Sequence, residues 1–164
     1  RNEPGAADAM RREPIDLHAL AVDVAMGWVP NALQRDIDLG FEAQVEQAMI
    51  HGDADRLREL INNLIDNAIR YTPRGGIITV RCGETAGRPF LEVEDNGPGI
   101  AEEHMEQIFE RFYRVPGSPS NGCGLGLPIV KEIAASHGAD IKVTRCESGG
   151  LRIRLEFPRQ IRSG

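Results

Sequence analysis

The clearest amphipathic pattern in this chain of 164 residues is Leu60-Ile-Asn-Asn-Leu-Ile-Asp-Asn-Ala-Ile-Arg-Tyr-Thr-Pro73. Its apolar side chains recur at intervals of three and four residues, as they do along the buried side of a helix. Thr72-Pro73 and the glycine pair at 75–76 then end the pattern. The spacing predicts a helix over residues 53–71 that packs one side on a hydrophobic core.

Two asparagines stand beside the apolar positions of this helix. Asn63 and Asn67 are four residues apart, so they share one side of the helix, with Arg70 and Tyr71 on the next turn. Asparagine is a poor helix former, by about 0.7 kcal/mol relative to alanine, so two of them in this place need a reason. They are either solvated side chains or ligands of magnesium, a hard cation that needs only one or two protein oxygens when phosphates and water complete its shell.

Helices and short strands alternate along the rest of the chain. Asp16 can cap a helix with apolar positions 17, 20, 21, 24 and 28, which Pro30 and Asn31 should stop, and a pair of short strands over 37–42 and 47–50 follows. The expected elements after the long helix are a hairpin of strands 77–81 and 89–95, a short helical stretch over 105–112, a helix over about 125–137, and a hairpin of strands 140–145 and 151–157. This order predicts an α+β fold, a two-layer sandwich with a mixed, mostly antiparallel sheet covered on one face by helices.

Length and composition indicate one globular domain, with 41% hydrophobic and 27% charged residues. We expect residues 1–14 to form a linker, 15–158 the domain, and 159–164 a tail. The apolar stretches are far shorter than the ~20 residues that cross a bilayer. Because the chain starts at Arg1 without a methionine, we expect a processed or excised piece.

Charge, cysteines and histidines exclude several classes of function. A net charge of -6 argues against binding to nucleic acid or to an anionic membrane. Cys82, Cys123 and Cys146 are odd in number and lack CxxC spacing, which indicates a reducing cytoplasm instead of a disulfide framework or a zinc site. The 4 histidines are scattered without metal-ligand spacing, so no transition-metal site is expected.

Asp95 ends the strand predicted over residues 89–95. Alternation puts it on the same face as Leu91 and Val93, while Glu92 and Glu94 share the other face. A carboxylate on an apolar face is costly unless a donor meets it. Asp95 either caps its own turn or accepts a hydrogen bond from the amino group of adenine; a carboxylate would repel the carbonyl that guanine presents there.

The segment Gly122-Cys-Gly-Leu-Gly-Leu127 leads directly into a predicted helix. Its glycines leave backbone amides exposed at the positive end of that helix, an arrangement that can hold phosphate. The segment has no Gly-Lys-Ser/Thr and no strand before it, so it is neither a P-loop nor a Rossmann turn. The segment over 115–122 is rich in turn formers and is predicted to be mobile.

These features, in this order, resemble the histidine-kinase branch of the gyrase, chaperone and mismatch-repair ATPase superfamily over residues 15–158. Residues 60–73 resemble the N box, Asp95-Asn-Gly-Pro-Gly99 the first glycine box, Ile108-Phe-Glu-Arg-Phe-Tyr113 the F box, Gly122–Leu127 the second glycine box, and Ser148-Gly-Gly-Leu151 the last one. The resemblance implies the Bergerat fold, in which residues 114–122 form a lid over the nucleotide. Cys123 stands where the family commonly has a hydroxyl residue, and Pro128 where it has a small one.

The resemblance also implies the ligands and the residues that hold them. Asn63 and Asn67 would bind Mg²⁺ and phosphates and act in catalysis with Arg111, Arg70 and Tyr71 would flank the phosphates, and Asp95 would bind adenine. Arg111 and Arg114 could approach the γ-phosphate of ATP. The remaining nucleotide contacts implied are Gly97, Gly99, Ile100, Gly122, Cys123, Gly124, Leu125, Gly126 and Leu127.

The reaction follows from what stands at position 63. Hydrolysing members of the superfamily carry a glutamate there, but an amide cannot activate water, so Asn63 predicts a site that holds ATP for a separate nucleophile. Glu59 is interpreted as a solvated helix residue. His18 lacks the His-Glu or His-Asp context of a phosphoacceptor, so the acceptor histidine would lie on a separate dimerisation domain.

The implied protein is therefore a phosphoryl donor in a relay. Its partners would be its own dimerisation and phosphotransfer domain and the receiver domain of a response regulator, in a homodimeric parent in the bacterial inner membrane with this domain in the cytoplasm. Two alternatives stay open: a gyrase-type ATPase, and an ATP-binding regulator or a serine kinase that acts on an anti-sigma partner.

Overall fold

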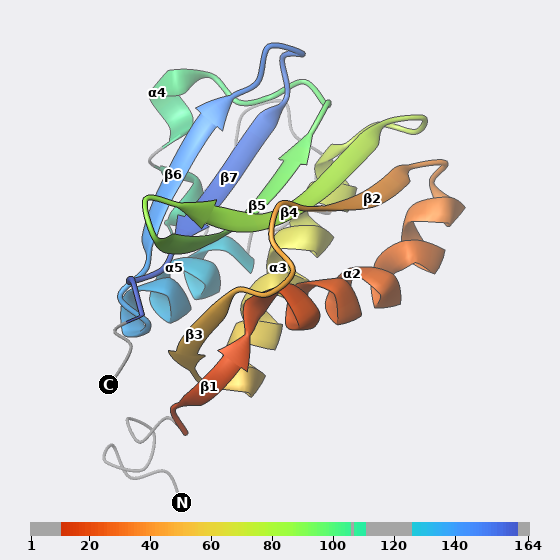
Figure 1. The fold of residues 1–164 in the computed structure, drawn as a ribbon. Coiled ribbons are helices and arrows are strands. Elements are labelled where there is room, and N and C mark those ends of the chain that lie inside the picture. Colours follow the sequence, from red (N-terminus) through yellow and green to blue (C-terminus); the bar gives the residue numbers. More distant parts are fainter. Residues whose placement is uncertain (1–10, 106, 111–125, 161–164) are drawn as a thin grey trace, which may run out of the picture.

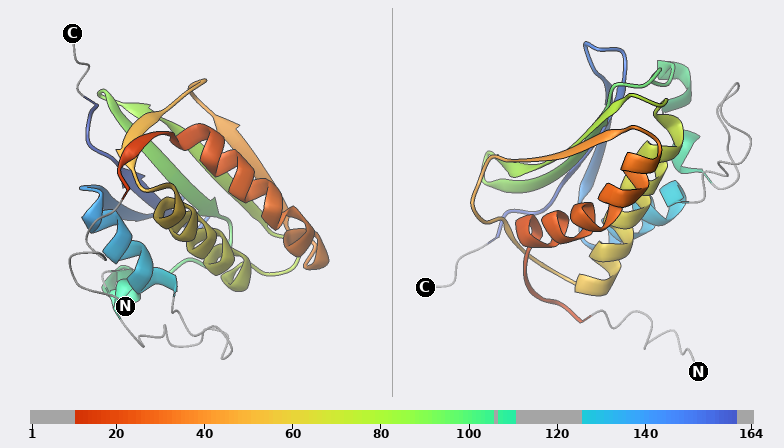
Figure 2. Two further views of the ribbon diagram at one scale, coloured as in Figure 1. Left: turned by 90° about the horizontal axis from the view of Figure 1, so that it is seen from below. Right: turned by 90° about the vertical axis from the view of Figure 1, so that its right-hand side faces the viewer.

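The protein is a two-layer sandwich in which three helices cover one face of a five-stranded sheet (Figures 1 and 2). The computed structural model describes residues 11–105, 107–110 and 126–160. The three covering helices are α2 (Leu17–Gln34), α3 (Ala54–Tyr71) and α5 (Gly126–Ser136). The right-hand view of Figure 2 shows no helix of the described residues over the opposite face of the sheet, which is called the open face below. The predicted α+β fold class is confirmed.

The sheet has the strand order β2-β4-β5-β7-β6. Its strands are β2 (Asp38–Ala43), β4 (Ile77–Thr85), β5 (Arg88–Asp95), β6 (Asp140–Arg145) and β7 (Leu151–Glu156). β2 pairs with β4 in parallel, and the other neighbours are antiparallel. Both predicted hairpins form, and the β4–β5 hairpin is longer than expected because pairing continues to Thr85 and Arg88, across the turn at Ala86 and Gly87.

The long helix α3 forms as its spacing predicts. Asp53 caps it, since its carboxylate accepts hydrogen bonds from the amides of Asp55 (3.0 Å) and Arg56 (3.2 Å). Thr72 ends the helix in an extended conformation, as expected for the residue before Pro73. Asp16 likewise caps α2 by accepting from the amide of His18 (3.1 Å).

The expectation that Pro30 and Asn31 stop the helix capped by Asp16 is wrong, because α2 runs on to Gln34 with Pro30 inside it. A proline there removes one amide donor and crowds the preceding turn. The added turn buries Ala32, which is 1% exposed, and its carbonyl accepts from the amides of Arg35 and Ile37 (3.0 and 2.9 Å). Tertiary packing at Ala32 and Ile37 thus outweighs the cost of the proline.

The sequence suggested that the two short strands after α2 form a pair. In the structure they do not pair with each other. β2 joins the main sheet, whereas β3 (Met49–Gly52) pairs antiparallel with β1 (Glu13–Asp16) in a separate two-stranded sheet. β1 thus begins inside the segment expected to be a linker. The Asp16 carboxylate accepts from the amide of Ala48 (3.0 Å), which holds the chain before β3 beside the start of α2.

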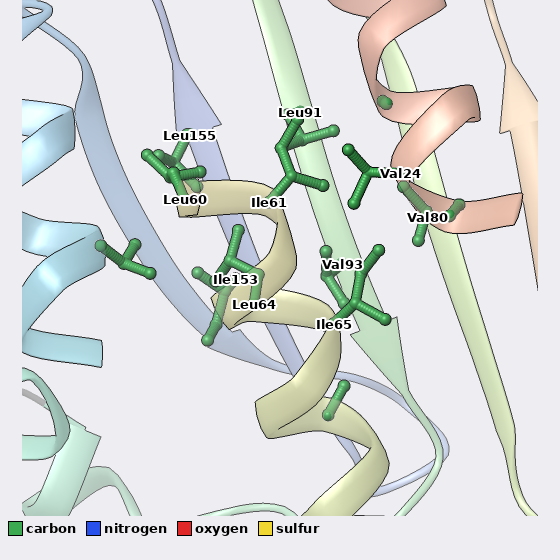
Figure 3. Close-up of a cluster of buried hydrophobic side chains, with 14 of the residues drawn as sticks. Val24, Leu60, Ile61, Leu64, Ile65, Val80, Leu91, Val93, Ile153 and Leu155 are labelled. Atoms are coloured by element: carbon green, nitrogen blue, oxygen red, sulfur yellow. The ribbon is translucent and has the colours of Figure 1, made fainter. Parts of the chain in front are cut away.

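A single hydrophobic core lies between the sheet and its helices (Figure 3). Leu60, Ile61, Leu64 and Ile65 of α3 point into it, and all are at most 2% exposed. They meet Leu91 and Val93 of β5 and Ile153 and Leu155 of β7. Burial of each such side chain is worth about 1.5–3 kcal/mol, so α3 is the helix that fixes the sandwich.

Two smaller elements connect β5 to the last part of the chain. Around the helical stretch expected over 105–112, the described residues form α4 (Glu102–Met105) and the 3-10 turn η1 (Gln107–Phe109), which buries Ile108 and Phe109. Cys82 lies on β4, which extends beyond the predicted strand 77–81, and Cys146 falls just beyond β6. Among the described residues, none of the helices has the length and apolar character needed to span a bilayer.

Candidate functional site

Asn63 and Asn67 lie on the same side of α3, both half-buried between the core and solvent. Asn67 is flanked by Asp66, whose carboxylate pairs with the Arg70 guanidinium one turn later (3.3 Å). Glu59, one turn before Asn63, is exposed, as the sequence indicated. The two amides therefore stand at the edge of the core, where each keeps one side accessible.

The end of α3 meets the turn that follows β5. A Cβ atom placed on Gly97 would lie 3.2 Å from the Tyr71 carbonyl oxygen and 3.5 Å from Cδ of Pro73. The residues after the second asparagine therefore sit against the Asp95-Asn-Gly-Pro-Gly99 turn. The structure thus brings together two motifs, residues 60–73 and 95–99, that are separated along the chain by the 21 residues 74–94.

Asp95 occupies the half-buried end of β5, on the helix-facing side of the sheet as alternation predicted. Its carboxylate accepts hydrogen bonds from the amides of Gly97 (2.9 Å) and Leu151 (3.3 Å). Burial raises the pKa of Asp95 above its ordinary value, although both hydrogen bonds oppose this, and the charge of Glu94 raises it further. The bond to Gly97 is the turn-capping interaction that the sequence allowed, and it leaves open whether the carboxylate also receives a ligand donor.

The turn Ser148-Gly-Gly-Leu151, which resembles the last glycine box, packs against Asp95, a contact that the sequence did not predict. A Cβ atom on Gly150 would collide with the Asp95 backbone, and one on Gly99, whose φ is +74°, would collide with the Gly149 carbonyl. The amide of Leu151 is then placed to donate to Asp95. The sequence indicated this glycine pair as a hairpin turn and as the last glycine box, but neither assignment predicted a hydrogen bond to Asp95.

Thr72 is a second residue whose place near the site the sequence did not indicate. It is fully buried at the end of α3, and its Oγ1 is the buried side-chain polar atom for which the described part of the chain supplies no hydrogen-bond partner. Its methyl group packs under Gly76, where a Cβ atom could not fit. A buried hydroxyl without a partner costs free energy, so this position needs an explanation.

α5 brings the end of the second glycine box to α3, against which it packs. Leu127 is 4% exposed and belongs to the core, so any ligand contact it makes would come from its backbone. Ile100 is half-buried and also packs on the core. Pro128 lies in the first turn of α5, where a missing amide is tolerated. The predicted site residues Arg111, Arg114, Gly122, Cys123, Gly124 and Leu125 lie outside the described residues.

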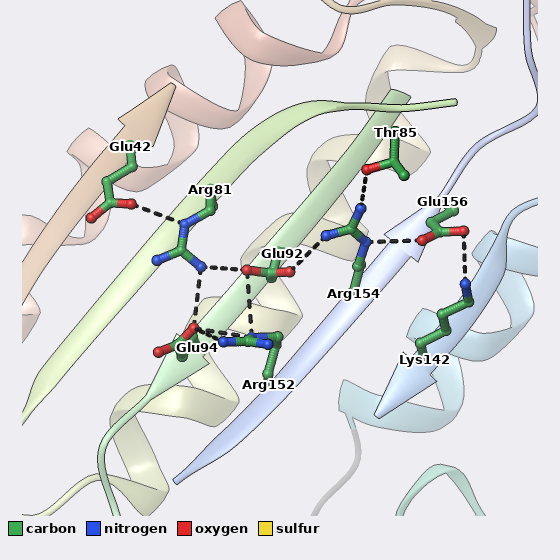
Figure 4. Close-up of polar contacts among 9 residues, drawn as sticks. All are labelled: Glu42, Arg81, Thr85, Glu92, Glu94, Lys142, Arg152, Arg154 and Glu156. Atoms are coloured by element: carbon green, nitrogen blue, oxygen red, sulfur yellow. Dashed lines mark hydrogen bonds and ion pairs between the residues drawn. The ribbon is translucent and has the colours of Figure 1, made fainter. Parts of the chain in front are cut away.

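The open face of the sheet carries the other charged groups of β5 (Figure 4). Glu92 is 3% exposed and pairs with Arg81 and with Arg154, the latter at 3.1 Å. Glu94 accepts from Arg81 (3.1 Å) and Arg152 (2.9 Å). Burial alone would raise the pKa of Glu94, but hydrogen bonds from Arg152 and Arg81 hold it below its ordinary value. These carboxylates are engaged by arginines.

The donor types on the helix side fit a magnesium nucleotide. Amide oxygens of Asn63 and Asn67 are ligands that a hard cation accepts, and few protein ligands are needed where phosphates and water supply the rest. Asp95 is an anionic acceptor at the rim of a core, which suits an exocyclic amino group. The amides at the start of α5 are donors that suit phosphate.

Comparison with known proteins agrees with this geometry. The family model of histidine kinase-, DNA gyrase B- and HSP90-like ATPases matches residues 52–161, so the chain belongs to this family of ATP-binding proteins. The similar sequences include sensor kinases and histidine kinases. The sensor protein kinase PmrB of Pseudomonas aeruginosa is 39% identical over 148 residues, which are 89% of this chain and 31% of that protein. The signal transduction histidine-protein kinase BaeS of Escherichia coli is 33% identical over 153 residues, 92% of this chain and 32% of that protein.

Solved structures give the same result. The catalytic domain of the histidine kinase ThkA matches with a TM-score of 0.80 and 28% identity, over 92% of this chain and 98% of that one. The mycobacterial sensor histidine kinase MprB matches with a TM-score of 0.78 and 29% identity, over 89% and 97%. The chain is thus the catalytic domain of a two-component sensor histidine kinase, and it spans about a third of the length of the curated relatives it matches.

Proposed function

We propose that this domain binds Mg-ATP between α3, the Asp95 turn and the start of α5, and donates the γ-phosphate to a histidine on a separate dimerisation domain. The receiver aspartate of a response regulator would then take the phosphate. The observation that supports the proposal is the meeting of the end of α3 with the turn that holds Asp95, because one nucleotide site needs the helix of Asn63 and Asn67 beside the carboxylate of Asp95.

Each group has one task in this proposal. Asp95 accepts from the adenine amino group, while Asn63 and Asn67 hold Mg²⁺ through their amide oxygens. Bound magnesium would neutralise charge on the phosphates. Backbone amides at the start of α5 would orient the phosphate chain. Asn63 offers no basic oxygen to water, so the γ-phosphate is kept for an incoming imidazole.

The partners follow from the relatives. One solved structure is that of ThkA in complex with the response regulator protein TrrA. This domain matches a chain of that structure with a TM-score of 0.77 and 27% identity, over 91% of this chain and 42% of that one. This supports a receiver domain as the downstream partner here. The parent protein would supply the acceptor histidine and act as a homodimer at the bacterial inner membrane, with this domain on the cytoplasmic side.

Calorimetric titration with ATP, with and without magnesium, tests the binding step. Asn67→Ala should weaken Mg-ATP binding about tenfold, which corresponds to roughly 1.4 kcal/mol, and should remove most of the benefit of magnesium. Glu59→Gln is the matched control on the same helix and should leave the affinity unchanged because Glu59 is exposed and lies about two turns before Asn67. Equal affinity in the Asn67 variant, with or without the metal, would contradict the proposed site.

A further inference from the structure

A buried histidine joins α3 and α5 at the ends opposite to the candidate site. His137 follows α5 directly and is 3% exposed. Its Nε2 lies 3.1 Å from the amide nitrogen of Asp53, the cap of α3, and its Nδ1 lies 2.9 Å from the carbonyl oxygen of Ile133. An amide only donates and a carbonyl only accepts. The two partners therefore fix a neutral ring with its proton on Nδ1.

The His137 ring packs closely against the backbone of Gly52. A Cβ atom on Gly52 would lie 2.6 Å from Cδ2 of His137 and 2.8 Å from Nε2. The Ser136 hydroxyl donates to the Ile133 carbonyl (2.7 Å) and lies 3.2 Å from Nδ1. The ring is thus held between the end of β3 and the last turn of α5.

The segment that enters β1 contacts the same two helix ends. The Arg12 guanidinium donates to the Ser136 carbonyl (2.6 Å), and the amide of Arg11 donates to the Asp53 carboxylate (3.2 Å). The charged groups that face His137 are Arg12 from this segment and Asp53 and Arg56 from the start of α3. Burial lowers the pKa of His137 below its ordinary value and the two arginines act in the same direction, while the hydrogen bond to Ile133 and the charge of Asp53 oppose the shift.

We propose that neutral His137 is a positioning residue, which holds the last turn of α5 against the first turn of α3 and so sets how the opposite ends of the two helices face each other. Residues 53 and 67 are about 21 Å apart along α3, at 1.5 Å per residue. Because packed helices move as rigid bodies, a shift at Asp53 is carried to Asn63 and Asn67. Protonation would put a donor in front of the Asp53 amide and a positive charge beside Arg12 and Arg56. The contact is therefore present above the ordinary histidine pKa and lost as pH falls.

This inference rests on the proposed function in one respect, that Mg-ATP binds between the end of α3 and the start of α5. NMR titration of the wild-type domain tests the contact without a nucleotide. His137 should titrate below the ordinary histidine pKa, and the amide resonances of Asp53 and of the last turn of α5 should shift with it. His51, which is exposed and faces Gln160, is the control residue for the variants. An Asp53 amide that does not follow the ring would overturn the proposal.

Variants then separate positioning from folding. In His137→Gln the amide oxygen can still accept from Asp53 but does not titrate, so Mg-ATP affinity should stay near that of wild type at pH 7.5 and fall less on acidification. His137→Ala should weaken binding about threefold to tenfold at neutral pH, the range expected for one lost buried hydrogen bond. Gly52→Ala should do the same by displacing the ring.

His51→Gln is the control and should keep the pH profile of wild type. Identical pH profiles in wild type, His51→Gln and His137→Gln would overturn the proposal. If no variant and not even the wild type binds Mg-ATP, the proposed function fails. The NMR titration then decides the positioning role by itself.

Discussion

The carboxylates on the two faces of strand β5 have different kinds of partners. On the open face, Glu92 and Glu94 are surrounded by arginines of β4 and β7. On the helix face, Asp95 accepts only from the backbone amides of Gly97 and Leu151 among the described residues. The pKa of Glu94 is lowered by its hydrogen bonds, whereas burial raises the pKa of Asp95.

In the proposed function, this difference separates the acids that stabilise the sheet from the acid that receives the nucleotide. A carboxylate that arginines already engage stabilises the sheet and has little left to offer a ligand. A carboxylate held by backbone amides at the edge of the core stays a strong acceptor, at a cost to the folded state. Substitutions on the two faces should therefore change different measurable quantities.

The largest effect is expected at Asp95. Asp95→Asn should weaken binding of adenine nucleotides tenfold or more, because a charge-assisted hydrogen bond contributes roughly 1.5–3 kcal/mol. The free energy of unfolding at pH 7 should stay the same or rise, since the variant removes a buried charge while its amide oxygen still accepts from Gly97. Calorimetric titration and denaturant unfolding measure the two quantities, and unchanged nucleotide affinity would remove Asp95 from the site.

Glu92→Gln should show the reverse pattern. The variant leaves Arg81 and Arg154 with one acceptor fewer, so the free energy of unfolding should fall by about 1–2 kcal/mol. Its Mg-ATP affinity should match that of wild type because the side chain lies on the far face of the sheet (Figure 4). A clear loss of nucleotide affinity in the folded variant would show that the faces are not independent.

The next largest effect is expected in the pH dependence of stability that Glu94 contributes on the open face. The folded-state pKa of Glu94 lies below its ordinary value of 4.5, so its contribution to stability is present above that pH and is lost as pH falls through the folded-state pKa. Glu94→Gln should lower stability at pH 7 by about 1 kcal/mol and flatten the acid dependence. Glu84→Gln, at an exposed position of β4, is the control. Equal slopes of stability against pH in wild type and Glu94→Gln would contradict this origin.

The smallest effect is expected at Thr72. Thr72→Val replaces a buried hydroxyl that has no partner among the described residues with a methyl group of similar shape. Stability should be unchanged or rise by up to about 1 kcal/mol. Mg-ATP affinity should stay within about twofold of wild type, a difference below 0.5 kcal/mol. A larger drop in affinity would place this hydroxyl in the nucleotide site.

The sequence predicted what local periodicity determines. The spacing of apolar residues predicted α3, and alternation in β5 placed Asp95 with Val93 and opposite Glu94. Pairings set by distant parts of the chain were missed. The bond from Leu151 to Asp95 joins residues 56 apart, and that from Asp53 to His137 joins residues 84 apart. Pro30 was misjudged for the same reason, since only tertiary packing shows that α2 continues beyond it.

The resemblance to known motifs implied ligands for individual residues, whereas the structure gives the positions of those residues. Asn63, Asn67 and Asp95 lie on the helix side of the sheet near the joined ends of α3 and β5, as a shared site requires. Their ligands remain proposals, because amides and a carboxylate at a rim also serve turns and caps. Predictions for Arg111, Arg114 and Cys123 concern residues outside those the structure describes.

Phosphoryl transfer with γ-labelled ATP tests the central claim most directly. The isolated domain should bind Mg-ATP but neither label itself nor release phosphate quickly, because Asn63 is no base and the domain carries no acceptor histidine motif. Adding the dimerisation domain should produce an acid-labile label on that domain, and Asn67→Ala should abolish it. Rapid phosphate release by the isolated domain would indicate a gyrase-type ATPase, and an acid-stable label on it or on a protein partner would indicate a serine kinase. Either result would contradict the histidine-kinase account.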